Sequence, residues 1–349
     1  MATPSYPPAR TTPPRSVIER DGHRFGTFDG PIEQVNPHEI GAGRVARAVR
    51  TRGLKEWEAF QLGDDRWFVL GAVYDAKVLG LLQVIAVHKE QATITRWQAK
   101  VPSPRVSVAR GLSGTRSHGH AGGFSVTIGN ELSSGRVHVD ASHAGRRGLE
   151  PMELHGSGMC PPDGTGHLVI VHPFDDDRAL YSHKAMMPFD GWLRIGAEQV
   201  GFDPATAFLI LDDHHGEYPR PQRYDWLTGV RRAPDGRVEG FNLTANQVRD
   251  PDVFNENAIW IGSAVHRLPA ITVDRPAGPW GPWHAHDRDG AVDVRFTPTV
   301  RSALHVGPRH ALAEYYAPYG WFEGSIEAED ARLDVDGFFG VGEQKLIRV

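Results

Sequence analysis

The sequence predicts an all-β protein made of two antiparallel β-barrel or sandwich domains with little helix. Short segments rich in valine, isoleucine, phenylalanine, tyrosine and tryptophan follow one another along the whole chain, and this composition is typical of strands. The chain also contains 39 glycines and 26 prolines, which interrupt those segments at close intervals. Helical periodicity is nearly absent, and residues 45–55 are one of the few candidate helices.

Length and terminal composition suggest how the chain is divided. A chain of 349 residues is long enough to bury a large core and to form two domains. Residues 1–23 are rich in proline and threonine, so we predict a flexible tail there. We expect an N-terminal β domain at 24–190 and a C-terminal β domain at 191–349, because the two halves contain similar numbers of predicted strands.

The predicted strands of the first half follow one another with short turns between them. After a loop or short strand at 24–35, this pattern predicts an antiparallel meander. Its strands are predicted at 67–74, 78–87, 92–101, 105–109, 123–128 and 136–142, whereas the apolar residues of 54–60 have mixed spacing. Residues 156–166 are rich in glycine and proline and are predicted to form a long loop. A strand is predicted at 167–172, and the pattern at 181–188 is mixed.

The second half has the same character. A second sheet is predicted to begin at 191–201, and the apolar residues 207–211 have the composition of a buried strand. Residues 257–273 are predicted to form two strands joined by a tight turn at Gly262 and Ser263. The remaining strands are predicted at 224–226, 237–248, 291–298, 311–316, 321–328, 331–337 and 339–347.

The segment 207–226 contains the densest group of chemically active side chains. Its buried strand leads without a loop into Asp212, Asp213, His214 and His215. Pro219 then keeps the next residues out of a helix. Adjacent strand residues point to opposite faces, so at most two of the four side chains can converge. The alternative is a polar hairpin end with solvated charges.

General acid–base catalysis is the chemistry that we favour for this segment and for a second one at 242–260. The candidate catalytic residues are Asp213, His214, Tyr218 and Glu256, and the candidate substrate-binding residues are Arg223, Trp226, Asn242, Asn246, Asn257 and Trp260. A carboxyl group in an apolar cavity has a raised pKa and can donate a proton. Asp213 or Glu256 would therefore be the acid, and His214 and Tyr218 would orient groups or relay protons.

Both segments are expected to face one cavity, because consecutive antiparallel strands are usually neighbours and alternate residues share a face. Aromatic side chains lining that cavity can stabilise a carbocation. The alternative is ordinary packing for Trp226 and Trp260, and strand-end hydrogen bonding for the asparagines.

Composition argues against several other classes of function. The formal net charge of −5 differs from the basic footprint of a nucleic-acid-binding protein. No apolar run approaches the roughly 20 residues that span a bilayer. The first residues have no apolar secretory region, and Cys160 is the only cysteine, so we expect a cytoplasmic protein. No glycine-rich nucleotide loop opens a helix, so no cofactor is predicted, and the oligomeric state is left open.

Three groups are candidate metal ligands, and the first is the Asp212–His215 cluster, whose carboxylates and imidazoles suit zinc or iron. His118 and His120 lie among glycines, which suggests a mobile loop. His284 and His286 match the first part of a cupin metal motif, but no glutamate follows at the required spacing, so a packed loop is the preferred interpretation. No metal site is predicted, and a metal-dependent oxygenase or hydrolase stays as a third hypothesis.

Together these motifs resemble the DUF2804 family. They are D-x-H-x-G-x-Y-P from Asp212, N-L-x-x-N from Asn242, E-N-A-I-W-I-G from Glu256, and the ending 319–324. Residues 54–60, LKEWEAF, agree with the start of that domain. The resemblance covers roughly residues 24–349, and the family is similar to the lipocalin-like group of carotenoid 1,2-hydratases, tocopherol cyclases and certain fungal Diels–Alderases.

The resemblance implies two lipocalin-like β domains with a hydrophobic ligand pocket in or between them. It also implies the addition of water to isoprenoid or polyketide substrates, or their cyclisation, without a redox cofactor. The leading hypothesis is therefore a cofactor-independent hydratase or cyclase that acts on a hydrophobic small molecule. The alternative is a non-catalytic carrier of a lipid or isoprenoid.

Overall fold

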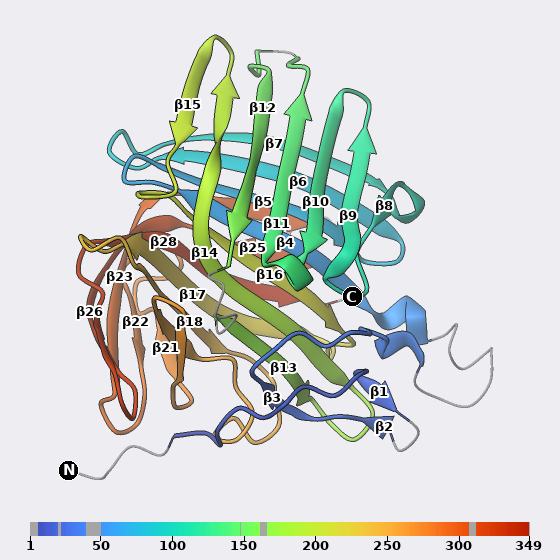
Figure 1. Cartoon of the computed structure of the whole chain (residues 1–349), viewed down its shortest axis with the longest axis vertical. Coiled ribbons are helices and arrows are strands. Elements are labelled where there is room, and N and C mark those ends of the chain that lie inside the picture. The colour runs from blue at the N-terminus through green and yellow to red at the C-terminus, as the bar shows by residue number, and fades with distance from the viewer. Residues whose placement is uncertain are drawn as a thin grey trace.

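The structure, a computed structural model, describes residues 6–19, 22–39, 50–146, 148–160, 166–306 and 312–348. Of these residues, 61% are in strands and 4% are helical. The strands form two large antiparallel sheets, of which one is a nearly closed barrel and the other a half-barrel (Figure 1). The predicted all-β fold with two barrel-like domains is thus confirmed. Among the described residues no helix is both long and apolar enough to cross a membrane.

The first sheet has 14 strands in the hydrogen-bonded order β7-β6-β5-β4-β16-β14-β12-β11-β10-β9-β8, with β3, β13 and β15 beside this path. They are β3 (Gly26–Phe28), β4 (Lys55–Gly63), β5 (Trp67–Asp75), β6 (Leu79–His88), β7 (Thr93–Pro102), β8 (Val106–Ser107), β9 (Ser113–Ala121), β10 (Phe124–Glu131), β11 (Arg136–His143), β12 (Met152–Met159), β13 (His167–Pro173), β14 (Ala179–Ile195), β15 (Glu198–Phe202) and β16 (Phe208–Gly216). The sheet folds back on itself around a core that includes Phe60, Trp97 and Phe189.

The second sheet has 12 strands, ordered β20-β19-β18-β17-β28-β26-β23-β22-β21, with β24, β25 and β27 beside this path. They are β17 (Gln222–Arg232), β18 (Val238–Ala245), β19 (Ala258–Ile261), β20 (Ala264–Arg267), β21 (Thr272–Asp274), β22 (Trp283–His286), β23 (Val292–Val300), β24 (Ala303–Val306), β25 (Ala313–Tyr316), β26 (Tyr319–Glu327), β27 (Arg332–Asp334) and β28 (Phe338–Ile347). The predicted hairpin at 257–273 is present as β19 and β20, which pair directly.

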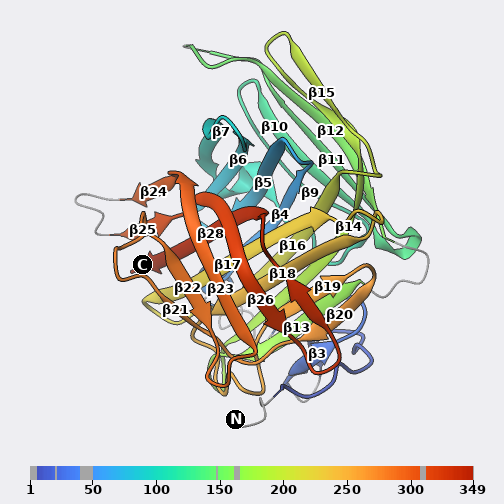
Figure 2. The same cartoon turned by 90° about the vertical axis from the view of Figure 1, so that its left-hand side faces the viewer.

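Strands β4, β5 and β6 lie between the second sheet and the outer strands β9–β12 of the first (Figure 2). They are therefore buried on both faces. In β5, Val69 packs inside the first sheet, whereas Phe68 and Leu70 pack against residues of the second. This arrangement explains why β5 and β6 are nearly continuous apolar runs rather than alternating ones. The shared core between the sheets includes Phe208 and Trp260.

The proline-rich N-terminal segment packs on the first sheet where it is described, instead of forming a free tail. Val17 is buried in a small apolar cluster with Phe28 and Tyr181. The Arg10 guanidinium donates a hydrogen bond of 2.6 Å to the carbonyl oxygen of His167. Strands β1 (Ile18–Glu19) and β2 (Gly22–His23) then pair as a short hairpin near β3 (Figure 1).

The change from one sheet to the other does not occur near residue 190. Strand β14 runs continuously through 190 and 191; its first half pairs with β16 and its second half with β12. Residues 191–201, predicted to begin a second sheet, therefore belong to the first. The chain crosses to the second sheet between β16 and β17, and we propose the domain boundary in that turn, at 217–221.

Three local predictions also change. His118 and His120 lie on β9 instead of in a mobile loop, because Gly122 and Gly123 close a tight turn to β10 with positive φ angles of 53° and 68°. The predicted loop at 156–166 begins later, since β12 continues to Met159, and residues 161–165 lie outside the described ranges. Of the candidate helix at 45–55, residues 45–49 lie outside the described ranges, residues 50–53 are helical as predicted, and β4 begins at Lys55.

Candidate functional site

A cavity of about 670 Å³ lies between the two sheets. The first sheet contributes lining residues from β4, β5, β6, β14 and β16, and the second from β17, β18, β25 and β28. Most of its wall is apolar or aromatic, and Trp57, Leu70, Leu180 and Trp226 are examples. A cavity of this kind is suited to a hydrophobic small molecule.

Side chains alternate between the two faces of β16, so the four consecutive polar residues 212–215 are divided between them. Asp212 and His214 line the cavity, on the same face as Phe208 and Ile210, which pack between the sheets. Asp213 points to the opposite face, where Leu211 packs inside the first sheet. Only two of the four consecutive polar side chains therefore reach the cavity.

A buried lysine on β14 stands between two carboxylates at one end of the cavity. The Lys184 ammonium forms an ion pair with Asp212, and its Nζ lies 3.4 Å from Glu256 Oε2. Nζ also lies 5.4 Å from the ring centre of Trp226. Burial alone would lower the pKa of Lys184, but Asp212 and Glu256 raise it above its ordinary value. The lysine is thus held as a cation.

A hydrogen-bonded chain runs from Tyr218 through His214 to Glu256. The Tyr218 hydroxyl lies 2.8 Å from His214 Nδ1, and His214 Nε2 lies 3.5 Å from Glu256 Oε2. The Glu256 carboxylate can only accept a hydrogen bond, so the tautomer with its proton on Nε2 lets Nδ1 accept from the phenol. The imidazole stacks on Trp57 with ring centres 4.4 Å apart, which fixes its orientation.

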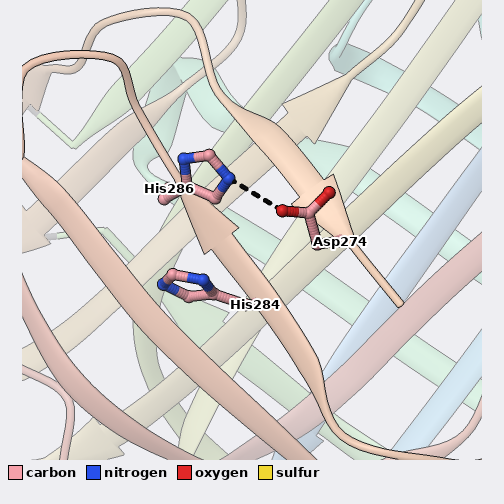
Figure 3. Close-up of side chains that lie close together, drawn as sticks. All are labelled: Asp274, His284 and His286. Carbon is pink, nitrogen blue, oxygen red and sulfur yellow. Dashed lines mark hydrogen bonds and ion pairs between the residues drawn. The ribbon is translucent and has the colours of Figure 1, made fainter. Parts of the chain in front are cut away.

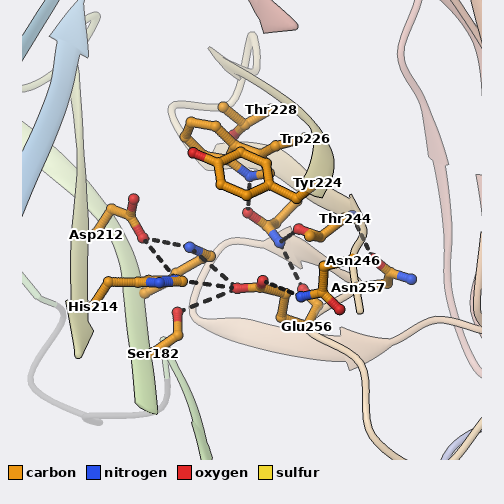
Figure 4. Close-up of polar contacts among 12 residues, drawn as sticks. Ser182, Asp212, His214, Tyr224, Trp226, Thr228, Thr244, Asn246, Glu256 and Asn257 are labelled. Atoms are coloured by element: carbon orange, nitrogen blue, oxygen red, sulfur yellow. Dashed lines mark hydrogen bonds and ion pairs between the residues drawn. The ribbon is translucent and has the colours of Figure 1, made fainter. Parts of the chain in front are cut away.

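Glu256 has more partners than any other group in this cluster (Figure 4). The Ser182 hydroxyl donates to its Oε2 at 3.2 Å, and the Asn246 amide donates to its Oε1 at 3.4 Å. Burial on its own would raise the pKa of Glu256, but Lys184 and the hydrogen bond from His214 lower it well below the ordinary value. The sequence argument expected a raised pKa for this carboxyl; the structure gives the opposite direction, because a cation lies beside it.

A second ionisable group lies on β28. Glu343 accepts hydrogen bonds from the hydroxyls of Tyr224, at 3.1 Å, and Tyr315. Burial raises the pKa of Glu343, although Tyr315 and Lys345 oppose the shift. Lys345 donates to the Tyr224 hydroxyl at 3.2 Å, and its Nζ lies 5.0 Å from the ring centre of Trp57. Burial lowers the pKa of Lys345 to about 8.

The residues predicted as site residues divide into two groups. Those that line the cavity are His214, Tyr218, Trp226, Asn246 and Glu256. Asn242 lies behind the wall: it accepts a 2.6 Å bond from the Trp226 indole and donates a 2.7 Å bond to the Glu256 carbonyl. Asn257 accepts from the Thr244 amide at 2.6 Å. Both asparagines therefore hold cavity residues in place.

Three other predicted residues do not reach the cavity. The Trp260 indole is fully buried and donates to the Gly166 carbonyl at 2.9 Å. Arg223 is exposed. Asp213 lies on the far face of β16, as described above. In their place the structure adds Lys184, Asp212, Glu343 and Lys345, each of them a charged residue inside a strand.

Asp213 belongs to a separate buried network inside the first sheet. His215 joins it to Glu56, with Nε2 lying 3.0 Å from Asp213 Oδ1 and Nδ1 lying 3.1 Å from Glu56 Oε1. Asp213 is also directly opposite Glu58 in the β4–β16 register, and both side chains are 0% exposed. Burial and the nearby Asp213 raise the pKa of Glu58 to about 8.

This network predicts a pH dependence of stability. The pKa of Glu58 is about 8 in the folded state and 4.5 ordinarily. The contribution of this shift to the unfolding free energy is therefore full below pH 4.5 and is lost as pH rises through 8. Other buried groups titrate between pH 6.5 and 8 as well, and burial lowers the pKa of Lys77, Lys89 and Lys345 to about 8, so only the difference between wild type and a Glu58 variant isolates this carboxyl. In that window Glu58 alone should lower the unfolding free energy by up to about 1.4 kcal/mol per pH unit. Urea titrations of wild type and Glu58→Gln measure this slope, which should be flatter in the variant; equal slopes would contradict the assignment.

A group of three potential metal ligands lies on the second sheet, away from the cavity (Figure 3). Asp274, His284 and His286 place their ligand atoms within 4.8 Å of one another. The two histidines are on strand β22, not in the expected packed loop, and their neighbours Trp283 and Ala285 fill the core on the other face. An imidazole pair with a carboxylate suits zinc. None of the three lines the cavity, so a metal held there would not contact a molecule bound in it.

Comparison with known proteins gives a family and two fold relatives. Residues 9–348 match the family described as Domain of unknown function (DUF2804). The structure is similar to that of kievitone hydratase from Nectria haematococca, with a TM-score of 0.53, 12% identity, and coverage of 93% of this chain and 98% of that chain. It is also similar to a structure of CghA with Sch210972, with a TM-score of 0.50, 10% identity, and coverage of 85% and 88%. The search of curated proteins gives no match. At these identities the likeness establishes a shared fold.

Proposed function

This chain belongs to the DUF2804 family, and we propose that it is an acid–base enzyme of hydratase or cyclase type. It acts without a redox cofactor on a hydrophobic small molecule held in the cavity between the sheets. An isoprenoid or polyketide skeleton is the ligand that we expect. The fold relative named as a hydratase supports this choice among the possible reactions.

The observation that carries the proposal is the chain Tyr218–His214–Glu256, which opens into an apolar cavity. A phenol hydroxyl backed by an imidazole, which is in turn backed by an ionised carboxylate, can accept a proton at neutral pH. The carboxylate orients the ring and stabilises the imidazolium that forms, as in other catalytic triads. Lys184 keeps Glu256 ionised.

The complementary acid is Glu343. It lines the same cavity, and its pKa is shifted upward while that of Glu256 is shifted downward. Two carboxyls whose environments separate their pKa values are a common acid–base pair. Phenolic hydrogen bonds from Tyr224 and Tyr315 hold Glu343 in position.

The reaction that fits this pair is addition across a polarised double bond. Glu343 donates its proton to one carbon of the ligand. Water adds to the other carbon and gives a proton to the Tyr218 oxygen, while the phenolic proton moves to His214 Nδ1. The imidazolium beside Glu256 and the Glu343 carboxylate are reset by proton exchange with solvent. If a hydroxyl of the ligand replaces water, the same transfers give a ring instead of an alcohol.

Mass spectrometry tests the proposal. We expect a hydrophobic molecule to co-purify from the native host and to be released on denaturation. Incubated with the protein in ¹⁸O-labelled water, that molecule or its precursor should gain one labelled water if the enzyme is a hydratase, or give an isomer of unchanged mass if it is a cyclase. Recovery of the ligand unchanged would favour the carrier. Turnover that depends on a stoichiometric metal, removed by a chelator, would favour the metal-dependent class.

A further inference from the structure

The charges that line the cavity do not balance. Among its described lining residues are the cations Arg52, Lys55, Lys100, Lys184, Arg220 and Lys345, against the carboxylates Asp212, Glu256 and Glu343. The whole chain has the opposite sign, with a formal net charge of −5. A basic cavity in an acidic protein indicates a preference for an anionic ligand.

The inner charges balance, because two lysines face the carboxylates of Asp212 and Glu256, and Glu343 is the protonated acid of the proposed function. Lys184 pairs with Asp212 and Glu256, as described above. Lys345 is joined to Glu343 through the Tyr224 hydroxyl. The positive excess therefore belongs to the four outer residues, which are Arg52, Lys55, Lys100 and Arg220.

These four residues form the cationic rim of the cavity. Arg52, Lys100 and Arg220 are exposed, and Lys55 is half-buried. None of the four forms an ion pair with a carboxylate of the described chain. The carboxylate that most affects Lys55 is Asp75, and it already pairs with Lys77 at 2.9 Å.

Lys55 and Arg220 are the pair that we select to share one anion, because both line the cavity and both lie at the same end of the β4–β16 pair. Burial lowers the pKa of Lys55, and the positive charge of Arg220 acts in the same direction. Lys55 begins β4 and Arg220 lies in the turn after β16, and their strands pair at Lys55 and Gly216. A bound anion would form charge-assisted hydrogen bonds with both cations.

Exposed apolar side chains surround the same opening. Val78, Leu79 and Leu312 line the cavity and are 81%, 41% and 38% exposed. Large apolar groups left in solvent at the edge of a pocket commonly mark the path of a ligand. The rim thus combines cations with apolar surface, and the interior is mainly apolar.

We infer that the ligand of this cavity is an amphipathic anion, whose carboxylate or phosphate is bound by Lys55 and Arg220 while its apolar body lies between the sheets. This inference rests on the proposed function for the location of the site and adds the chemical class of the ligand. Binding is measured without turnover, so the two can fail separately.

Three probes of equal chain length test the inference: hexadecanoic acid, hexadecyl phosphate and hexadecanol, each below its critical micelle concentration. In calorimetric titrations the acid or the phosphate should bind at least about tenfold more tightly than the alcohol, since the alcohol has no charge with which to form charge-assisted hydrogen bonds. The better of the two anions identifies the head group. Its affinity should also fall as salt concentration rises.

The double variant Lys55→Gln with Arg220→Gln should weaken binding of the anion about tenfold or more and leave the alcohol unchanged. Arg66→Gln is the matched control, because Arg66 is exposed and does not line the cavity. Thermal midpoints confirm that all variants are folded. Equal affinity for the three probes, no binding of any probe, or no effect of the double variant would overturn the inference. Binding only to vesicles of anionic lipid would overturn it in favour of a membrane-docking rim. Binding of the anion with no turnover of any ligand would support the inference and contradict the proposed enzyme.

Discussion

Replacing Glu256 with glutamine is expected to reduce turnover by roughly 10²–10⁴-fold while the ligand still binds. The amide cannot stabilise an imidazolium at His214, so the proton leaving the nucleophile has no favourable destination. Binding should persist because most of the cavity wall is apolar, and Asp212 remains as a partner for Lys184. Single-turnover rates and ligand affinity, measured on the same preparation, separate the two effects.

A matched control for this variant is Glu153→Gln. Glu153 pairs with Arg194 on strands β12 and β14 and does not line the cavity. The Glu153→Gln variant should keep both its turnover and its affinity for the ligand. Unchanged turnover in Glu256→Gln would exclude the proposed base chain, and a loss of binding equal to the loss of turnover would mean that Glu256 only holds the ligand.

Replacing Lys184 with methionine should lower the unfolding free energy at pH 7 by about 3–5 kcal/mol. The substitution keeps the apolar stem but leaves Asp212 and Glu256 buried without a counter-charge. Urea denaturation at pH 7 measures the loss. Lys100→Met is the control, because Lys100 is exposed and its charge can be removed at little cost.

In the Lys184→Met variant, the change of the unfolding free energy with pH should have the opposite sign to that in the wild type. In the wild type the pKa of Glu256 is lowered, so its contribution to stability is present above pH 4.5 and is lost on acidification. Without Lys184, burial raises the pKa of Glu256, the folded state binds a proton more tightly, and stability should rise as pH falls from 7 towards 5. A stability loss below 1 kcal/mol, or continued loss on acidification, would mean that water already solvates this cluster.

The sequence was sufficient for the architecture because period-two patterns and turn residues are local signals. The segment 257–273, for example, contains its own turn, and β19 and β20 form where predicted. The predicted break at residue 191 had no such basis. Gly191 lies within β14 beside Gly156 of β12, and a side chain there would meet the His155 carbonyl at 2.3 Å. That glycine serves close packing and does not end a strand.

The sequence could not show which of Asp212 and Asp213 faces the cavity, and the reason is different. A shift of one residue exchanges the two faces of a strand, and a doubled aspartate followed by a doubled histidine looks the same in either register. The charge state of Glu256 could not be predicted from the sequence either, because it depends on Lys184, which lies on another strand. Tertiary neighbours, not local composition, set the direction of a pKa shift.

Strand β16 acts as a common wall between two compartments. Its even-numbered polar residues, Asp212 and His214, face the ligand cavity, and its odd-numbered ones, Asp213 and His215, hold together the interior of the first sheet. Natural selection can therefore act on the two sides almost independently. Under the proposed function, substitutions at even positions would change which molecule binds in the cavity, whereas those at odd positions would change the stability of the barrel. A new ligand could then be accommodated by varying every second residue of one strand, while the residues between them preserve the scaffold.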